Sequence, residues 1–309
     1  MGRIRGFWKN FFSEYKNFGF GFSFSYRIIG RLKGKRYKNE VVANYLKKQL
    51  SSVIAKYSEY TEVPSTIAED APIWVCWWQG EQNMPPIVAA CYRSLKTHAG
   101  THPVNLITFE NLNDYIAFPS YIIEKQKEGK ITLTHLSDIL RFALLAEYGG
   151  LWIDSTVFVT GDLDLTGKNF FTIKCNRPDD GYFVSKYRWA GFCIGGDKSN
   201  VLFAALRDLL FLYWKLNDMA IDYLFFDTLI DIMYQTNTVV REMIEENPYN
   251  NEGVDVMCRY MNKAYDFEVF KEICESTCLH KLSWKEKYEE KDVDGRATLY
   301  SWLIKNKNE

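Results

Sequence analysis

The sequence predicts an α/β protein, in which a sheet is covered by helices and preceded by a basic helical arm. After about residue 70, short runs of β-branched and aromatic residues alternate with segments of helical period, a pattern typical of α/β proteins. Before that point, basic and aromatic residues dominate. The 309 residues are 47% hydrophobic and 25% charged, so we expect a large buried core, either in one large domain or in one domain with an appendage.

The first 60 residues are strongly basic. They contain thirteen Lys or Arg and three acidic residues, a net charge of +10, whereas the rest of the chain sums to −11. Phe and Trp alternate with cations in "GFWKNFFSEYKNFGFGFSFSYRIIGRLKGKRYK", which suits the surface of an anionic membrane. The alternative is an ordinary helix whose aromatic side chains pack on the main domain. No apolar run reaches the roughly 18 residues of a membrane span, and nucleic acid is not expected as a partner because no recognition motif accompanies the charge.

A boundary is expected near residue 65. The segment "KNEVVANYLKKQLSSVIAKYSEY" has helical spacing, and the proline of "EVPST" ends it. We therefore predict a helical arm over residues 1–65 and one catalytic-sized unit over residues 66–309.

The seven cysteines predict the compartment. Their number is odd and no cleavable signal is recognised, so we expect reduced thiols in a cytoplasm. Cys274, Cys278 and His280 resemble a metal knuckle, but no second ligand pair lies at zinc-finger spacing, so a structural zinc is not favoured.

The main unit opens with a predicted strand, helix and strand. Residues 73–78 in "APIWVCWWQGEQNMPP" are too few for a helix and precede Gly80 and two prolines, residues 87–99 have helical period, and residues 104–110 predict a second strand. This order predicts parallel strands, whose carboxyl ends collect ligands. Trp77 and Gln79 lie at that end, although a tryptophan there more often packs in a core.

The segment "HLSDILRFALLAEYGGLWIDSTVFVT" predicts a helix followed by a strand. Ser137 or Thr134 is expected to cap a helix that ends near Tyr148, where two glycines follow. Asp138 and Arg141 share one face of this helix, which indicates either an intrahelical ion pair or a site.

The strand "LWIDSTVFV" that follows is expected to place Trp152, Asp154 and Thr156 on one face, by its period of two. A buried, ionised Asp154 needs a partner. At the open end of a strand, that partner would be a cation or the hydroxyls of a sugar.

These motifs resemble those of glycosyltransferases with the DXD motif, a group that includes yeast outer-chain mannosyltransferases and clostridial glucosylating toxins. "SDILR" and "GGLWIDST" match the pattern S-D-x-x-R, then G-G-x-[YW]-x-D-x-D. With "IWVCWWQG" and a late "HKLSWK", the order of motifs is more similar still to bacterial capsular polysaccharide synthesis glycosyltransferases. The resemblance covers roughly residues 70–290, and the combined order is far more specific than a bare D-x-D.

The resemblance implies a GT-A-type fold, with a Rossmann-like mixed sheet flanked by helices. It also implies a nucleotide-sugar donor, with UDP favoured, a divalent Mn²⁺ or Mg²⁺, and retention of anomeric configuration. Asp138 would contact the donor ribose or sugar and Arg141 the sugar or diphosphate, while Asp154 would be the first acid of the motif. Trp77 and Trp152 would line the nucleotide site, with Gln79 beside them.

The late segment "LHKLSWKEKY" resembles a loop that covers the diphosphate in related transferases. His280 would then be a metal ligand and Lys281 a phosphate ligand, with Ser283 and Trp284 beside the donor. A basic surface turn with one anchoring tryptophan is the alternative. Two further acids, Asp222 and Asp227, are candidate acceptor-site carboxylates or solvated helix residues.

One position departs from the family pattern. The second acid of the motif is Thr156 here, and a hydroxyl is a poorer ligand for Mn²⁺ or Mg²⁺ than a carboxylate. We therefore expect weak, water-mediated or absent metal binding. Asp162 and Asp164 would be substitutes, although solvated acids in a turn explain them as well.

The sequence thus predicts a cytoplasmic glycosyltransferase, peripheral on the inner face of the cell membrane. It would move a sugar to a growing capsular or surface polysaccharide or to its lipid-linked precursor. A non-catalytic sugar-nucleotide or glycan-binding protein that has lost the second metal acid is the alternative. A metal-dependent phosphohydrolase is disfavoured, because no dense cluster of Asp and His appears.

Overall fold

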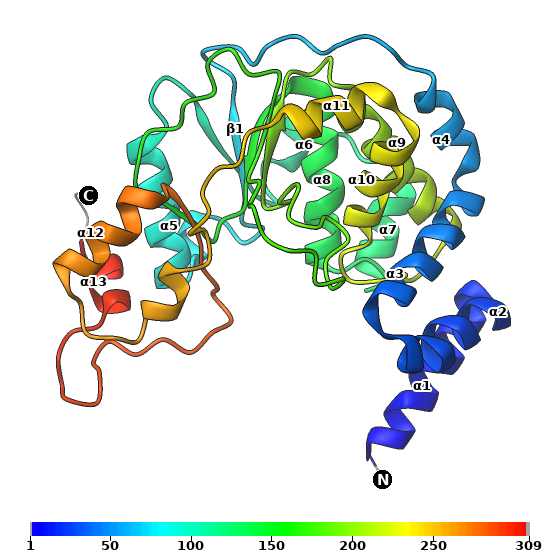
Figure 1. Ribbon diagram of the computed structural model, residues 1–309, viewed down its shortest axis with the longest axis horizontal. Helices are drawn as coiled ribbons and strands as arrows, with labels where there is room; N and C mark the ends of the chain where they lie inside the picture. Colours follow the sequence, from blue (N-terminus) through cyan, green and yellow to red (C-terminus); the bar gives the residue numbers. More distant parts are fainter. Residues whose placement is uncertain (1, 307–309) are drawn as a thin grey trace.

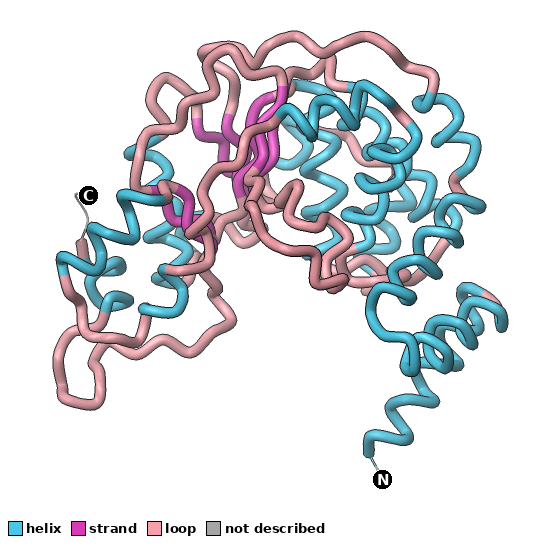
Figure 2. Tube along the Cα trace, in the orientation of Figure 1, coloured by secondary structure: helices cyan, strands magenta, loops and turns pink. Residues whose placement is uncertain are grey.

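The core of the molecule is a five-stranded sheet with strand order β2-β1-β3-β6-β5. The computed structural model describes residues 2–306, with side chains for residues 6–275 and 277–306. Its strands are β1 (Ile73–Cys76), β2 (Val104–Ile107), β3 (Gly150–Ile153), β5 (Phe170–Thr172) and β6 (Cys193–Gly196). A separate two-stranded ribbon consists of β4 (Val157–Val159) and β7 (Leu279–Lys281). Figure 2 shows both sheets in magenta.

The main sheet is mixed. Strand β1 pairs in parallel with β2 and β3, whereas β6 runs antiparallel to both β3 and β5. The predicted strand, helix and strand after residue 70 are confirmed as β1, α5 (Pro86–His98) and β2. The predicted fold class, a mixed sheet flanked by helices with a helical N-terminal region, is confirmed.

Helices cover both faces of the sheet (Figure 1). The longer helices of the main unit are α5 (Pro86–His98), α7 (Ser120–Lys127), α8 (Leu133–Tyr148), α9 (Val201–Leu216), α10 (Phe225–Thr236), α11 (Thr238–Glu246), α12 (Phe267–Ser276) and α13 (Leu299–Lys305). Short ones are α6 (Leu112–Tyr115) and the 3₁₀ turns Glu81–Asn83 and Met257–Tyr260. Because side chains alternate along a strand, Trp74 and Trp152 pack toward α8, α9 and α10, whereas Ile73 and Leu151 pack toward α5.

Two glycines end α8 and start β3, as the sequence predicts. Gly149 and Gly150 have φ of +68° and +95°, a conformation that residues with a Cβ rarely adopt. A Cβ at Gly150 would also collide with the carbonyl oxygen of Pro72. These glycines therefore let the chain reverse from α8 directly into the centre of the sheet, beside β1.

Two local predictions are wrong. The helix α8 is capped by Thr132, whose side chain accepts a hydrogen bond from the backbone N–H of His135, whereas Thr134 and Ser137 lie inside the helix. The predicted strand over residues 151–159 is two strands, because a turn closes at Asp154, whose N–H donates to Phe192 O while its own carbonyl accepts from Val157 N. Asp154 therefore lies where the chain leaves the main sheet for the ribbon of β4 and β7.

The N-terminal segment is mostly helical up to Ser58, with breaks at Gly19 and Leu50. It comprises α1 (Gly2–Phe18), α2 (Phe20–Ser23), a π-helical turn (Phe24–Ile29), α3 (Gly30–Gln49) and α4 (Ser51–Ser58). In Figure 1, α1 and α2 project from the body, whereas α3 and α4 lie along its helical layer. Leu46 and Leu50, both fully buried, share one core with side chains of α9 and α10. The boundary at residue 65 stays a prediction, and side chains on both sides of it pack together.

Candidate active site

A pocket of about 570 Å³ lies at the carboxyl ends of β1 and β3, between α8 and the segment after β7. Ten of the thirteen residues that the sequence singles out line it: Trp77, Gln79, Asp138, Arg141, Trp152, Asp154, Thr156, Lys281, Ser283 and Trp284. They come from four separate stretches of the chain. The pocket is therefore a product of the fold rather than of one motif.

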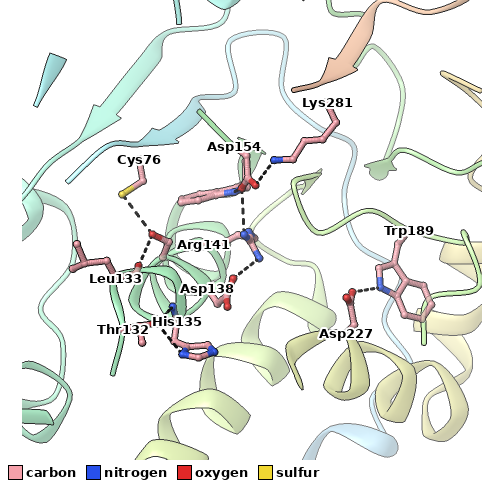
Figure 3. A network of polar contacts seen from close by, with 12 residues as sticks. Cys76, Thr132, Leu133, His135, Asp138, Arg141, Asp154, Trp189, Asp227 and Lys281 are labelled. Atoms are coloured by element: carbon pink, nitrogen blue, oxygen red, sulfur yellow. Dashed lines mark hydrogen bonds and ion pairs between the residues drawn. The ribbon is translucent and has the colours of Figure 1, made fainter. Parts of the chain in front are cut away.

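A chain of alternating charges crosses the pocket (Figure 3). Arg141 lies between two carboxylates, with Nη1 at 3.1 Å from Asp138 Oδ1 and Nη2 at 3.4 Å from Asp154 Oδ1. On the other side of Asp154, Lys281 Nζ lies 2.8 Å from Oδ2 and 2.8 Å from Thr156 Oγ1. Two cations thus flank one carboxylate at the open end of the sheet.

Aromatic rings hold Arg141 in place. Its guanidinium carbon lies 5.1 Å from the ring centre of Trp152 and 4.9 Å from that of Phe226, distances at which cation–π attraction is appreciable. The side chain is buried, and its Nε has no hydrogen-bond acceptor among the described residues. A buried donor without an acceptor is costly, so a ligand oxygen that reached Arg141 Nε would remove that cost.

Burial and the neighbouring cations shift the pKa values of Asp138 and Asp154 in opposite directions. Burial raises the pKa of Asp138 to about 7, with Arg141 opposing the shift. Burial acts on Asp154 in the same direction, but Lys281 and Arg141 together outweigh it, and the pKa of Asp154 is lowered. Asp154 is therefore the constant anion of the pocket, whereas Asp138 changes charge near neutral pH.

The raised pKa of Asp138 predicts a pH effect on stability. The folded state holds the Asp138 proton more tightly than the unfolded state. The resulting stabilisation of the folded state is fully present below about pH 4 and is lost as the pH rises to about 7. Asp138→Asn removes that loss, since an amide does not ionise. The free energy of unfolding of the variant, relative to that of wild type, should therefore rise by about 2 to 3 kcal/mol between pH 5 and pH 8. Urea unfolding of both proteins at the two pH values measures the gain, and parallel pH profiles would show that Asp138 is already ionised at pH 5.

Tryptophans form the pocket wall. The rings of Trp77 and Trp284 meet edge to face, with centroids 5.7 Å apart, and Trp284 remains half exposed at the rim. Behind them, Trp78 donates from Nε1 to Ser137 Oγ at 2.9 Å, which ties the end of β1 to α8. Flat rings beside cations suit a planar base that carries a phosphate chain.

Three predicted residues lie elsewhere. His280 is fully buried on the opposite face of β7, where Nε2 lies 3.0 Å from Thr160 Oγ1, and burial lowers its pKa to about 4. Asp222 binds Tyr26 and Lys35 of the N-terminal segment. Asp227 accepts from Trp189 Nε1 at 2.8 Å, and burial raises its pKa to about 6. Asp222 and Asp227 line a cavity of about 150 Å³ that shares only Tyr223 with the main pocket.

The suggested substitute acids also lie outside the pocket. The side chains of Asp162 and Asp164 are 91% and 76% exposed, and neither lines it. Asp164 accepts from Thr166 N within its own turn, which is the turn chemistry that the sequence offers as the alternative.

Sequence reasoning missed several residues of the pocket. Trp78, Ser137, Tyr223 and Lys285 line it but carried no functional expectation. Each stands next to a residue that did: Trp78 follows Trp77, Ser137 precedes Asp138, and Tyr223 follows Asp222. Position beside a motif was thus the available signal, although it does not say which neighbour points inward.

The chain is similar to a family model, to a curated protein and to a solved structure. A family model described as capsular polysaccharide synthesis protein matches residues 27–303. The curated O-glycosyltransferase braB of Annulohypoxylon truncatum is 28% identical over 137 residues, which are 41% of this chain and 30% of that protein. A solved apo structure of the bifunctional glycosyltransferase WbbM aligns over 80% of this chain and 52% of its own, with 11% identity and a TM-score of 0.37. The chain thus spans less than a third of the curated relative and about half of the solved chain.

Proposed function

The chain belongs to the capsular polysaccharide synthesis protein family, and on that premise we propose that it is a glycosyltransferase. It transfers a sugar from a nucleotide-diphosphate donor, with UDP favoured, to a growing capsular or surface polysaccharide or to its lipid-linked precursor. The enzyme works at the inner face of the cell membrane. The observation that carries the proposal is the pair of cations, Arg141 and Lys281, at a tryptophan-walled pocket over the strand ends.

The chemistry of transfer matches these charges. The bond between the sugar C1 and the diphosphate oxygen breaks, and its electron pair leaves with the diphosphate. The acceptor hydroxyl oxygen forms the new bond to C1 and gives up its proton to water. Preorganised cations stabilise the charge that grows on the leaving group. Arg141 and Lys281 are the cations that line the pocket within ion-pair distance of Asp154, and retention of configuration is part of the proposal because the sequence resembles retaining enzymes.

A panel of nucleotide sugars tests the proposal. Thermal unfolding is followed with UDP-, GDP- and CMP-sugars, in EDTA and in Mn²⁺, and release of the free nucleotide is measured in the same samples. A ligand at 100 times its dissociation constant stabilises by about 2.7 kcal/mol, so one nucleotide class should raise the melting temperature. Failure of every class to bind would refute the proposal.

Turnover separates the enzyme from a binding protein. The loss of the second acid at Thr156 favours a non-catalytic sugar-nucleotide binder as the second candidate. Such a protein would show the thermal shift without releasing the nucleotide diphosphate. Release of UDP above the rate of the Arg141→Met variant would decide for the enzyme.

The N-terminal helices supply a surface for the membrane. Exposed aromatic and aliphatic side chains gather there: Trp8, Phe12, Tyr15, Phe20, Phe24 and Leu32. Lys9, Lys16, Arg31 and Lys33 are exposed on the same helices. Among residues 2–306, no helix has the length and apolar character to cross a bilayer. We therefore propose that α1, α2 and the start of α3 bind anionic lipid in the plane of the interface.

Neutralising four cations of these helices should weaken liposome binding. Each cation near anionic lipid contributes about 1 kcal/mol, so replacing Lys9, Lys16, Arg31 and Lys33 by Gln should reduce the affinity for anionic vesicles by at least about a hundredfold. Sedimentation with vesicles at low and high salt measures it. Substitution is preferable to truncation, because deleting residues 1–60 would remove Leu46 and Leu50 from the core.

The control removes four exposed lysines elsewhere. The quadruple Gln variant of Lys127, Lys198, Lys215 and Lys271 changes the net charge equally. It should keep most of the vesicle binding. Equal losses in both variants would mean that net charge alone, and not the N-terminal surface, governs attachment.

A further inference from the structure

The residues expected to hold a divalent cation already share a different cation. Asp154 Oδ2 and Thr156 Oγ1 both lie 2.8 Å from the ammonium of Lys281. The third expected ligand, His280, is turned away from them, because neighbouring residues of β7 face opposite sides, and it is bound to Thr160 instead.

The donor set fits a divalent ion poorly. Mn²⁺ and Mg²⁺ favour six ligands, with carboxylates prominent among them, whereas this site offers one carboxylate and one hydroxyl. Among the described residues, no group of three or more His, Cys, Asp or Glu could hold a metal ion. The single carboxylate is also shared with Arg141, so an added divalent ion would meet two positive charges at close range.

Backbone pairing fixes the ammonium at this place. In the ribbon of β4 and β7, Lys281 lies directly across from Val157, and the next residue, Leu282, donates from its N–H to Thr156 O at 2.9 Å. The N–H of Lys281 itself donates to Val254 O at 2.7 Å. The lysine stem therefore starts from a rigid strand that is bonded to the chain carrying Thr156.

We infer that the Lys281 ammonium takes the place of the divalent cation, so that sugar transfer by this chain needs no metal ion. The inference rests on the proposed function. When the bond from C1 to the diphosphate oxygen breaks, the electron pair stays on the diphosphate, and Lys281 and Arg141 together face the new charge. Thr156 then has a positive role, because a hydroxyl accepts a hydrogen bond from the ammonium without adding the negative charge that would attract a metal.

A charge-exchange experiment tests this arrangement. The double variant Thr156→Asp with Lys281→Ala restores the second carboxylate and removes the ammonium. Binding of Mn²⁺ alone is measured by the loss of the free-ion electron paramagnetic resonance signal. Wild type should leave Mn²⁺ free at millimolar concentration, whereas the double variant should bind it. Tight binding of Mn²⁺ by wild type that Thr156→Ala abolishes would overturn the inference.

Turnover gives the second readout. Wild-type release of UDP should be the same in EDTA and in Mn²⁺, and Lys281→Ala should lower it by about 10²- to 10³-fold. Lys287→Ala, on the segment that follows β7 but outside the pocket and paired with Glu289, should match wild type. Release that appears only with Mn²⁺ would overturn the inference and leave the glycosyltransferase intact. Absence of release under every condition would instead refute the enzyme, while the Mn²⁺ binding experiment still tests the site.

Discussion

Replacing Asp154 by Asn is expected to lower UDP release by about 10³-fold while the protein still folds. The carboxylate accepts from Trp152 Nε1 at 2.9 Å and pairs with both Arg141 and Lys281. The neutral amide of the variant forms no ion pair with Arg141 or Lys281, and its NH₂ group points toward one of these two cations. The ammonium and the guanidinium then lose the positions in which the proposed mechanism needs them.

Stability separates this effect from simple unfolding. Lys281 is partly exposed, and Arg141 keeps its ion pair with Asp138. Asp154→Asn should therefore lower the free energy of unfolding by only about 1 to 3 kcal/mol. Calorimetry and UDP release are measured on the same preparations. Asp162→Asn, at a 91% exposed side chain, is the matched control and should stay close to wild type in both. Full activity of Asp154→Asn would remove Asp154 from the machinery.

The second large effect is expected at Arg141. Arg141→Met keeps an unbranched apolar stem between the rings of Trp152 and Phe226 but takes the cation away from the buried carboxyl of Asp138 and the partly exposed carboxyl of Asp154. Removing one partner of a buried ion pair costs about 3 to 5 kcal/mol, which is a fall in melting temperature of roughly 10 °C for a domain of this size. Donor-induced stabilisation should also disappear, because Arg141 lines the pocket in which we propose that the donor binds.

A compensating variant distinguishes charge from packing. Arg141→Met together with Asp138→Asn removes the orphaned carboxyl as well, so it should recover part of the lost stability but none of the donor binding. A double-mutant cycle over both sites gives the coupling energy. If the cycle shows no coupling, the cost of Arg141→Met comes from lost packing of the guanidinium on the rings. Arg141→Lys should be intermediate, since it keeps the charge but not the planar fork.

Local patterns predicted the centre of the sheet and the helix beside it. The apolar run that contains β1, the two glycines after Tyr148, and the shared face of Asp138 and Arg141 all follow from near-neighbour spacing. Together with the resemblance to glycosyltransferases, which alone pointed to Lys281, Ser283 and Trp284, this spacing placed ten of the thirteen candidate residues around one pocket. Motifs worked there because the ends of parallel strands meet at one edge of a sheet.

The remaining features depend on contacts between distant parts of the chain. Whether residues 151–159 form one strand or two depends on Phe192 and on β7, which lie far along the sequence. Similarly, His280 and Lys281 are equally plausible ligands by their residue type, and only the register of β7 decides which of them faces Asp154. Spacing within a motif contains no information about either choice.

The pairing of β4 with β7 also sets the order in which the pocket is completed during synthesis. Lys281 follows Asp154 by 127 residues, which a ribosome adds in roughly 6 to 25 s at 5 to 20 residues per second. During that interval the nascent chain contains Asp154 and Arg141 but has no strand to pair with β4. The pocket therefore acquires its second cation only when residues 279–281 have emerged, and an unfinished chain has Arg141 and Asp154 but neither the ammonium nor Trp284.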